Sequence, residues 1–251
     1  MTPVEPSYHH EGRPVVFAAD IHLDREQSTI DCFRTLCAGP AREAEALYLL
    51  GDIFDLWIGD DDPEPAYAPV MDALAELSGS GVPVRFIAGN RDFLLGDEFC
   101  RQTGVQRLDD HTLIDLFGTR TLLCHGDSLC TDDHEFQRFR AQLRTEQWQR
   151  EFLAKPLTER HRIAAELRDG SRDAMADKAN ALMDVSAQAV QDTLRGYQAR
   201  QLIHGHTHRP AHHEHMIDGH SATRYVLSDW PQHPSMLIAT AAGLRVETIG
   251  C

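Results

Sequence analysis

The chain has 251 residues and a formal net charge of −15, with 42% hydrophobic and 25% charged residues. This length and composition predict a single α/β domain over residues 1–251 that contains one insertion. The excess of acid excludes nucleic-acid binding through general electrostatics, because that mode needs clustered Lys and Arg opposite the phosphates. No apolar run approaches the roughly 20 residues that a membrane-spanning helix needs.

The first residues and the cysteines predict the compartment. The N-terminal sequence MTPVEPSYHHEGRP lacks the basic and apolar regions of a secretory signal, so we expect a cytoplasmic protein. The six cysteines have no CxxC spacing, which argues against a zinc ribbon and against a disulfide framework. We expect most of them to be reduced, buried thiols.

Apolar runs alternate with helical spacing along the first part of the chain. We expect strands within 14–20, 46–52 and 83–90, and helices near 28–43 and 66–80. Such alternation is typical of parallel strands that are joined by crossover helices. Further strands are expected in these segments: two within 111–126, then one each in 200–206, 223–230, 234–240 and 243–249.

Residues 128–200 have a different character. They contain 12 basic and 12 acidic residues, so this stretch is neutral while the rest of the chain is acidic. The apolar spacing predicts three or four amphipathic helices. Two interpretations remain open: the apolar residues pack against the main core, or they form a helical cap whose inner face receives an apolar ligand. The residues with this spacing include Trp148, Phe152, Leu153 and Ile163.

Polar side chains with ligand atoms follow five of the predicted strands. Alone, each has an ordinary explanation, because an Asp at a strand end often caps a turn and a lone His is often a structural residue. Together they predict a metal centre, since ligands of open α/β sheets bind beyond the carboxyl ends of the strands. The candidates are Asp20, His22, Asp52, Asn90, His125, His206 and His208.

This set of donors suits two divalent ions. A pair of ions about 4 Å apart shares a carboxylate, and Asp52 is the natural bridge. Asp20 and His22 are two residues apart, so in an extended segment they face one ion together. Imidazole, carboxylate and amide ligands suit manganese, iron or zinc.

The motifs also carry a resemblance to a known family. D-x-H, GD, GN, HGD and GHTH occur in this order and spacing, and they resemble the calcineurin-like metallophosphoesterase superfamily. The runs LYLLGDIFDLWIGDDD, FIAGNRDFLLG, LLCHGDSLCTDD and LIHGHTHRPAHH resemble the UDP-2,3-diacylglucosamine pyrophosphohydrolases of the lipid A pathway. The implied fold is an αββα sandwich of two mixed sheets flanked by helices, with a helical lid inserted at 128–200.

The resemblance implies a reaction and two Mn²⁺ ions per chain. UDP-2,3-diacylglucosamine would be hydrolysed to UMP and 2,3-diacylglucosamine 1-phosphate (lipid X) by metal-activated water that attacks the α-phosphorus. The first ion would bind four residues, namely Asp20, His22, Asp52 and His208. The second ion would bind Asp52, Asn90, His125 and His206. Catalytic roles are implied for Asp52, Asn90, Arg91 and His206.

Substrate contacts are implied as well. Arg91, in GNRD, would be a fixed cation for a substrate phosphate, and Asn90 and His206 would also meet the substrate. The lid would add Asp133, Ser171 and Lys178. Met175 stands where close relatives carry asparagine, and a thioether does not replace the hydrogen bonds of an amide.

The two acyl chains of the implied substrate would bind the apolar face of the lid, and the candidates for this acyl pocket are Trp148, Phe152, Leu153 and Ile163. We expect peripheral contact with the cytoplasmic face of the inner membrane through the neutral lid. No nucleic acid or obligate protein partner is expected. One alternative is another dinuclear-metal phosphodiesterase that acts on nucleotides. Another is a non-catalytic metal-binding scaffold, because the chain has 15 histidines. We expect a structural role for His204 and a solvated loop for His212, His213, His215 and His220.

Overall fold

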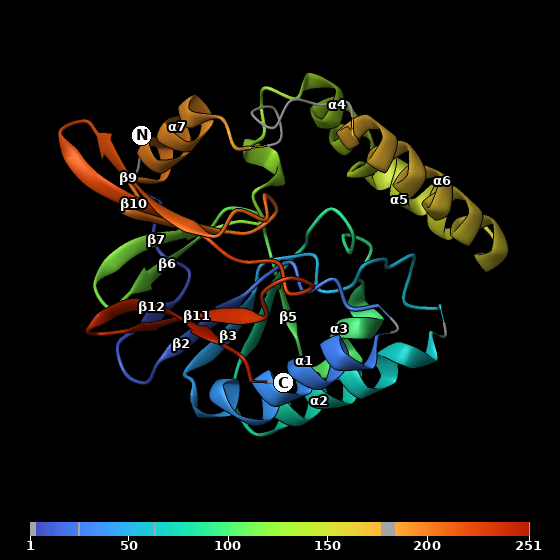
Figure 1. Ribbon diagram of the computed structural model, residues 1–251, viewed down its shortest axis with the longest axis horizontal. Coiled ribbons are helices and arrows are strands. Elements are labelled where there is room, and N and C mark those ends of the chain that lie inside the picture. The colour runs from blue at the N-terminus through green and yellow to red at the C-terminus, as the bar shows by residue number, and fades with distance from the viewer. Residues whose placement is uncertain (1–3, 25, 63, 177–183, 251) are drawn as a thin grey trace.

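Two six-stranded sheets lie face to face in the computed structural model, which describes residues 4–24, 26–62, 64–176 and 184–250. Helices α1 (Gln27–Ala38), α2 (Ala68–Gly79) and α3 (Asp97–Thr103) lie on the outer side of one sheet (Figure 1). Helix α7 (Ala187–Tyr197) lies over the other sheet. This arrangement confirms the predicted αββα sandwich.

The first sheet contains the N-terminal crossover units. Its order is β12-β11-β2-β3-β4-β5. Strands β2 to β5 are parallel neighbours, β11 pairs antiparallel with β2, and β12 pairs antiparallel with β11. The strand bounds are β2 Val15–Ala18, β3 Ala46–Leu49, β4 Val84–Ile87, β5 Gln106–Leu108, β11 Ser235–Thr240 and β12 Gly243–Thr248.

The second sheet is mixed and has the order β1-β6-β7-β8-β10-β9. Strands β7, β8 and β10 are parallel neighbours, whereas β6 and β9 pair antiparallel to β7 and β10. The bounds are β1 His9–His10, β6 Thr112–Leu116, β7 Thr119–Leu123, β8 Gln201–His204, β9 Ala211–Ile217 and β10 His220–Val226. The carboxyl ends of β7 and β8 therefore lie together at one edge.

The alternating side chains of β2 show why its sequence is continuously apolar. Val15 and Phe17 face the second sheet and join the core between the sheets, where Phe17 stacks on Tyr48 with ring centroids 5.3 Å apart. Val16 and Ala18 face the helices on the other side. A strand that is buried on both faces has no polar face to show.

The predicted helical segment contains two kinds of helix. Val190 and Leu194 of α7 are fully buried against the second sheet, so α7 is a layer of the sandwich. Helices α4 (His134–Leu143), α5 (Glu146–Leu153) and α6 (Leu157–Ala176) lie to one side of both sheets (Figure 1). From here on, we call α4 to α6 the lid.

Most of the apolar lid residues that we singled out pack against the main core. Phe152 is 3% exposed and stacks on Trp148, which also contacts Phe93. Ile163 is half-buried against the same core. Leu153 differs, because 40% of it is exposed. The packing interpretation therefore accounts for three of the four candidates.

Ion pairs join α6 to the acidic loop that follows β3. The buried guanidinium of Arg160 donates to the Ile58 carbonyl at 2.8 Å and forms a bidentate pair with Asp61. Further along the helix, Arg168 pairs with Asp55. Bidentate Arg–carboxylate geometry is directional. These contacts fix the lid relative to the segment that begins at Asp52.

The histidines after residue 211 were predicted wrongly. His212, His213 and His215 lie on β9, which pairs antiparallel with β10 from His220 onward. The turn is Asp218-Gly219, and both residues have positive φ, 48° and 80°. An Asp-Gly pair between two strand-forming runs is a hairpin signal, so the sequence did contain the information.

Two further expectations can be compared with the structure. Cys37, Cys124 and Cys130 are buried free thiols, and Cys100 is a half-buried one. Among the residues that the structure describes, no helix has the length and apolar character needed to cross a membrane.

Candidate metal centre

The seven predicted donors lie where the carboxyl ends of five strands meet. Each follows β2, β3, β4, β7 or β8 by two to four residues. These strands belong to both sheets, so the site spans the sandwich. The crossover topology therefore brings together residues that are up to 188 positions apart.

One group of donors consists of Asp20, His22 and His208. The Nε2 atoms of the two imidazoles are 3.1 Å apart, and Asp20 Oδ1 lies 3.5 Å from His208 Nε2 and 4.0 Å from His22 Nε2. Asp20 is fully buried, and its Oδ1 atom has no hydrogen-bond partner. An unsatisfied buried carboxylate oxygen is costly, so this arrangement fits a cation.

A second group lies around His125. Its Nδ1–H donates to the Leu50 carbonyl at 2.8 Å, which leaves the lone pair of Nε2 for a ligand. That Nε2 atom is 3.1 Å from Asn90 Oδ1 and 3.7 Å from Asp52 Oδ1. The ring of His206 lies beside that of His125, with centroids 5.0 Å apart.

The two groups are connected. Ligand atoms of Asp20, Asp52 and His125 all lie within 4.8 Å of one another. Oxygen and imidazole donors at this spacing fit divalent metal ions.

Burial and the neighbouring charges together set the protonation of this site. It raises the pKa of Asp52 to about 7 and lowers the pKa of His22 to about 3 and that of His206 to about 4. Burial would also lower the pKa of His125, but the nearby carboxylates, chiefly Asp52, outweigh it and raise the value to about 9. The carboxylates therefore favour a positive charge at this point, whether a proton or a metal ion carries it.

The backbone at the site is strained. Five of the seven donors have φ between 49° and 66°, in the left-handed region that non-glycine residues rarely adopt; they are Asp20, His22, Asp52, His206 and His208. Such strain costs about 1–3 kcal/mol per residue and is concentrated at functional sites. The folded structure therefore holds these side chains in positions that the isolated segments would not favour.

Two glycines let neighbouring loops approach the carboxylates. A Cβ atom on Gly89 would lie 2.1 Å from Asp52 Oδ1, and one on Gly205 would lie 2.1 Å from Asp20 Oδ2. Both distances are shorter than any van der Waals contact. The glycines of GN and GHTH are therefore required by the close packing of the loops on the two acidic side chains.

Asp92 was missed by the sequence interpretation, although it is the last residue of GNRD. It is fully buried, and its two oxygens accept from Ile53 N at 2.7 Å and Gly89 N at 2.9 Å. Asp92 thus ties the loop that carries Asp52 to the loop that carries Asn90. A carboxylate two residues after a candidate ligand was the available signal.

His204 has the structural surroundings that we predicted. It is fully buried, its Nδ1–H donates to the Gly205 carbonyl at 2.8 Å, and its Nε2 lies 3.3 Å from Arg224 Nη1. Burial lowers its pKa to about 3, so the ring is neutral. Both ring nitrogens already have protein partners.

Arg91 lies beside the site but is not part of either group. Its backbone N–H donates to Asp52 Oδ1 at 2.8 Å, and its guanidinium lies 3.9 Å from Asp55 Oδ1. Asp55 also pairs with Arg168 of the lid. Asp55 therefore lies between the guanidinium of Arg91 and that of Arg168 in the lid.

The predicted lid contacts are only partly described. The side chain of Asp133 caps α4 by accepting from Phe136 N at 3.1 Å. Ser171 and Met175 lie on α6, but their side chains are outside the described part of the structure, and so is Lys178 altogether.

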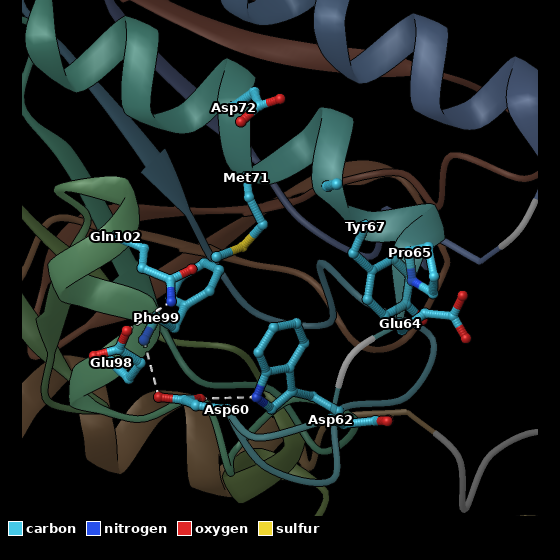
Figure 2. Close-up of a pocket in the computed structure, with 12 residues that line it drawn as sticks. Asp60, Asp62, Glu64, Pro65, Tyr67, Met71, Asp72, Glu98, Phe99 and Gln102 are labelled. Carbon is cyan, nitrogen blue, oxygen red and sulfur yellow. Dashed lines mark hydrogen bonds between the residues drawn. The ribbon is translucent and has the colours of Figure 1, made fainter.

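A cavity of about 430 Å³ opens elsewhere, between the loop before α2 and helix α3 (Figure 2). Its walls include Trp57, Tyr67 and Phe99, and its lining contains no predicted metal ligand. Asp60 accepts from Trp57 Nε1 and Phe99 N, so its carboxylate is used in holding this wall together.

Comparison with known proteins places these observations in a family. The model of the calcineurin-like phosphoesterases matches residues 13–210. A UDP-2,3-diacylglucosamine hydrolase of Photobacterium profundum is 43% identical over 93% of this chain and 96% of its own length. Hydrolases of the same name from Klebsiella pneumoniae and Aromatoleum aromaticum are 47% and 46% identical over 90% and 91% of this chain, and each match covers 94% of the relative. The chain belongs to the calcineurin-like phosphoesterase family and, within it, to the UDP-2,3-diacylglucosamine hydrolases.

Proposed function

We propose that this chain hydrolyses the pyrophosphate bond of UDP-2,3-diacylglucosamine, by attack of water at the α-phosphorus, to UMP and 2,3-diacylglucosamine 1-phosphate in lipid A biosynthesis. The observation that carries the proposal is the close approach of seven donors from five strand ends in a chain whose relatives bear the name of this hydrolase.

We propose that these donors hold two Mn²⁺ ions. One ion would take Asp20, His22, Asp52 and His208, and the other would take Asp52, Asn90, His125 and His206. When bound, such a pair lowers the pKa of water and offsets the negative charge that develops on the phosphorus oxygens. Imidazole with hard oxygen donors, and without thiolate, suits manganese.

The residues around the ions have their own tasks. Arg91 would bind a phosphate of the substrate, and Asp55 limits the positions that its guanidinium can take. The ring of Phe136 stacks over His206 with centroids 5.6 Å apart, so α4 restricts the orientation of that imidazole. Further contacts to the substrate are proposed for Asp133, Ser171 and Lys178 of the 128–200 segment.

The substrate class is tested by comparing kcat/KM for UDP-2,3-diacylglucosamine with that for UDP-N-acetylglucosamine at saturating Mn²⁺. We expect a preference of at least about 10²-fold for the diacyl substrate, because burying even a few methylenes supplies about 2–3 kcal/mol. Equal values, or faster hydrolysis of simple nucleotide diesters, would favour a general nucleotide phosphodiesterase.

We propose that the protein works at the cytoplasmic face of the inner membrane, where a diacylated substrate would be held. Two large apolar side chains of the lid are exposed, Phe139 at 38% and Leu153 at 40%. The F139E/L153E variant is expected to lose most of its sedimentation with phospholipid vesicles. The matched control is V246E on β12, at a residue that is 68% exposed but lies far from the lid in sequence. Equal sedimentation of both variants and the wild type would remove the lid from membrane binding.

A further inference from the structure

Asp127 is a buried carboxylate that the proposed mechanism does not use. It follows His125 by two residues and is 0% exposed. Its Oδ2 atom accepts from Arg140 Nε at 2.6 Å and lies 3.5 Å from Arg144 Nη2. Arg140 lies on α4, the first helix of the lid, and Arg144 is the C-cap of this helix. The carboxylate therefore ties the loop that carries His125 to the lid.

Arg144 makes a second set of contacts with the same nitrogen. Its Nη2 donates to the Gly89 carbonyl at 2.8 Å and to the Ala88 carbonyl at 3.2 Å. These carbonyls directly precede Asn90 in the chain. A single guanidinium nitrogen thus joins the backbone before Asn90 to the carboxylate after His125.

The joined loops carry two donors that contact each other. Asn90 Oδ1 and His125 Nε2 are 3.1 Å apart, and their positions depend on loops from different sheets. Within the described residues, none of these contacts of Arg144 is to His22 or His208. An influence of Arg144 should therefore be confined to one half of the site.

The same face of α4 continues this bracing. Gln137 Nε2 donates to the Asp127 carbonyl at 2.8 Å and to the Cys130 carbonyl at 3.1 Å. Gln137, Arg140 and Arg144 are spaced by three and four residues, so they share one side of the helix. All three side chains form hydrogen bonds with the loops of the site, whereas an ordinary surface helix is anchored by an apolar stripe.

We propose that Arg144 is a positioning residue for the metal centre. It holds Asn90 and His125 at the spacing that the second ion needs, so the affinity for that ion depends on the placement of α4. This inference rests on the proposed metal pair. It goes beyond the proposed pair because it makes the affinity for one ion, and not for the other, depend on the lid.

The first test measures Mn²⁺ binding by calorimetry in the wild type, Arg144→Ala and Arg138→Ala. Arg138 is an exposed residue of α4 and serves as the matched control. Asn90→Ala identifies the binding step that belongs to the second ion. We expect Arg144→Ala to raise the Kd of that step at least about tenfold, as loss of an outer-shell contact does. The Kd of the other step and both steps of Arg138→Ala should change less than about twofold.

The second test needs neither metal nor substrate. In metal-free Arg144→Ala, hydrogen exchange should become faster in peptides that cover 86–93 and 123–128, while those covering 17–23 and 203–209 keep the wild-type rates. This result would stand even if the protein acted on another substrate. Unchanged exchange in all four segments, or an equal increase in all four, would contradict the inference, and so would equal weakening of both ions.

Arg144→Lys tests the same inference if Arg144→Ala does not fold. Lysine keeps the positive charge but lacks the planar fork that reaches several acceptors at once. We expect a Kd for the second ion between those of wild type and Arg144→Ala. A wild-type Kd in Arg144→Lys would show that charge alone suffices and would overturn the positioning role.

Discussion

The Asp52→Ala variant is expected to lose at least about 10³-fold in kcat/KM on UDP-2,3-diacylglucosamine. Asp52 is the one residue proposed to contact both ions, and metal-ion stabilisation of a phosphoryl transition state contributes several kcal/mol, which corresponds to this factor. The carboxylate also accepts from Arg91 N at 2.8 Å, so its removal releases the loop that carries the proposed phosphate-binding cation. Steady-state rates at saturating Mn²⁺ measure the effect.

Two companion variants separate charge from packing. Asp52→Asn keeps the volume of the side chain and removes the charge, and it should lose nearly as much activity as Asp52→Ala. Asp115→Asn changes a carboxylate of β6 that accepts from Gly118 N in a turn, and it should keep wild-type activity within about twofold. Retention of more than a tenth of the wild-type kcat/KM by Asp52→Ala would sink the proposed bridging role.

The three histidines of LIHGHTHRP are expected to respond differently to substitution. His206→Ala and His208→Ala should each lower kcat/KM by about 10²- to 10³-fold, because each removes a proposed ligand of one ion. His204→Gln should keep activity within about tenfold and instead lower the free energy of unfolding by about 1–3 kcal/mol. Its Nδ1 hydrogen-bonds to the Gly205 carbonyl, and its Nε2 lies beside Arg224 Nη1. A buried polar group that loses its partner costs about 1–3 kcal/mol.

Kinetics and urea denaturation of the same three variants give the comparison. The expected pattern is loss of activity with little change in stability for His206 and His208, and the reverse for His204. His208 is 39% exposed at its side chain, so its replacement leaves no large cavity. Equal loss of activity in all three variants would remove the distinction between ligand and structural histidine.

Much of the fold was predictable because the parallel strands have both a pattern and a boundary. The runs before Asp20 and Asp52 are apolar on both faces, and the Asp marks the end of each strand, so the hydrophobic pattern and the strand boundary agree. The Asp218-Gly219 hairpin was overlooked because four histidines lie in β9 and at the start of β10, and their polarity suggested a solvated loop. Most of β9 is exposed, and an exposed strand has no apolar face that would mark it in the sequence.

The candidate site was predictable to the level of its donors but not of its supports. Strand-end placement predicted which side chains come together, since parallel topology brings carboxyl ends to one edge. The pairing of Asp127 with Arg140 and Arg144 depends on how α4 packs, over a sequence separation of 13 and 17 residues. No local pattern specifies which acid an arginine of an amphipathic helix will meet.

The arrangement of the helices within 128–200 was also not predictable from a local pattern. Neutral charge and helical spacing predicted helices within 128–200, but could not separate α7, which covers a sheet, from α4 to α6. Both kinds of helix have apolar stripes, and only the partner surface distinguishes them.

The most direct measurement of the central claim is hydrolysis of UDP-2,3-diacylglucosamine in oxygen-18 water with Mn²⁺, followed by mass spectrometry of both products. The proposed attack at the α-phosphorus predicts that the label enters UMP and that 2,3-diacylglucosamine 1-phosphate stays unlabelled. Label in the sugar phosphate, or no cleavage of this substrate by the Mn²⁺-loaded protein, would contradict it.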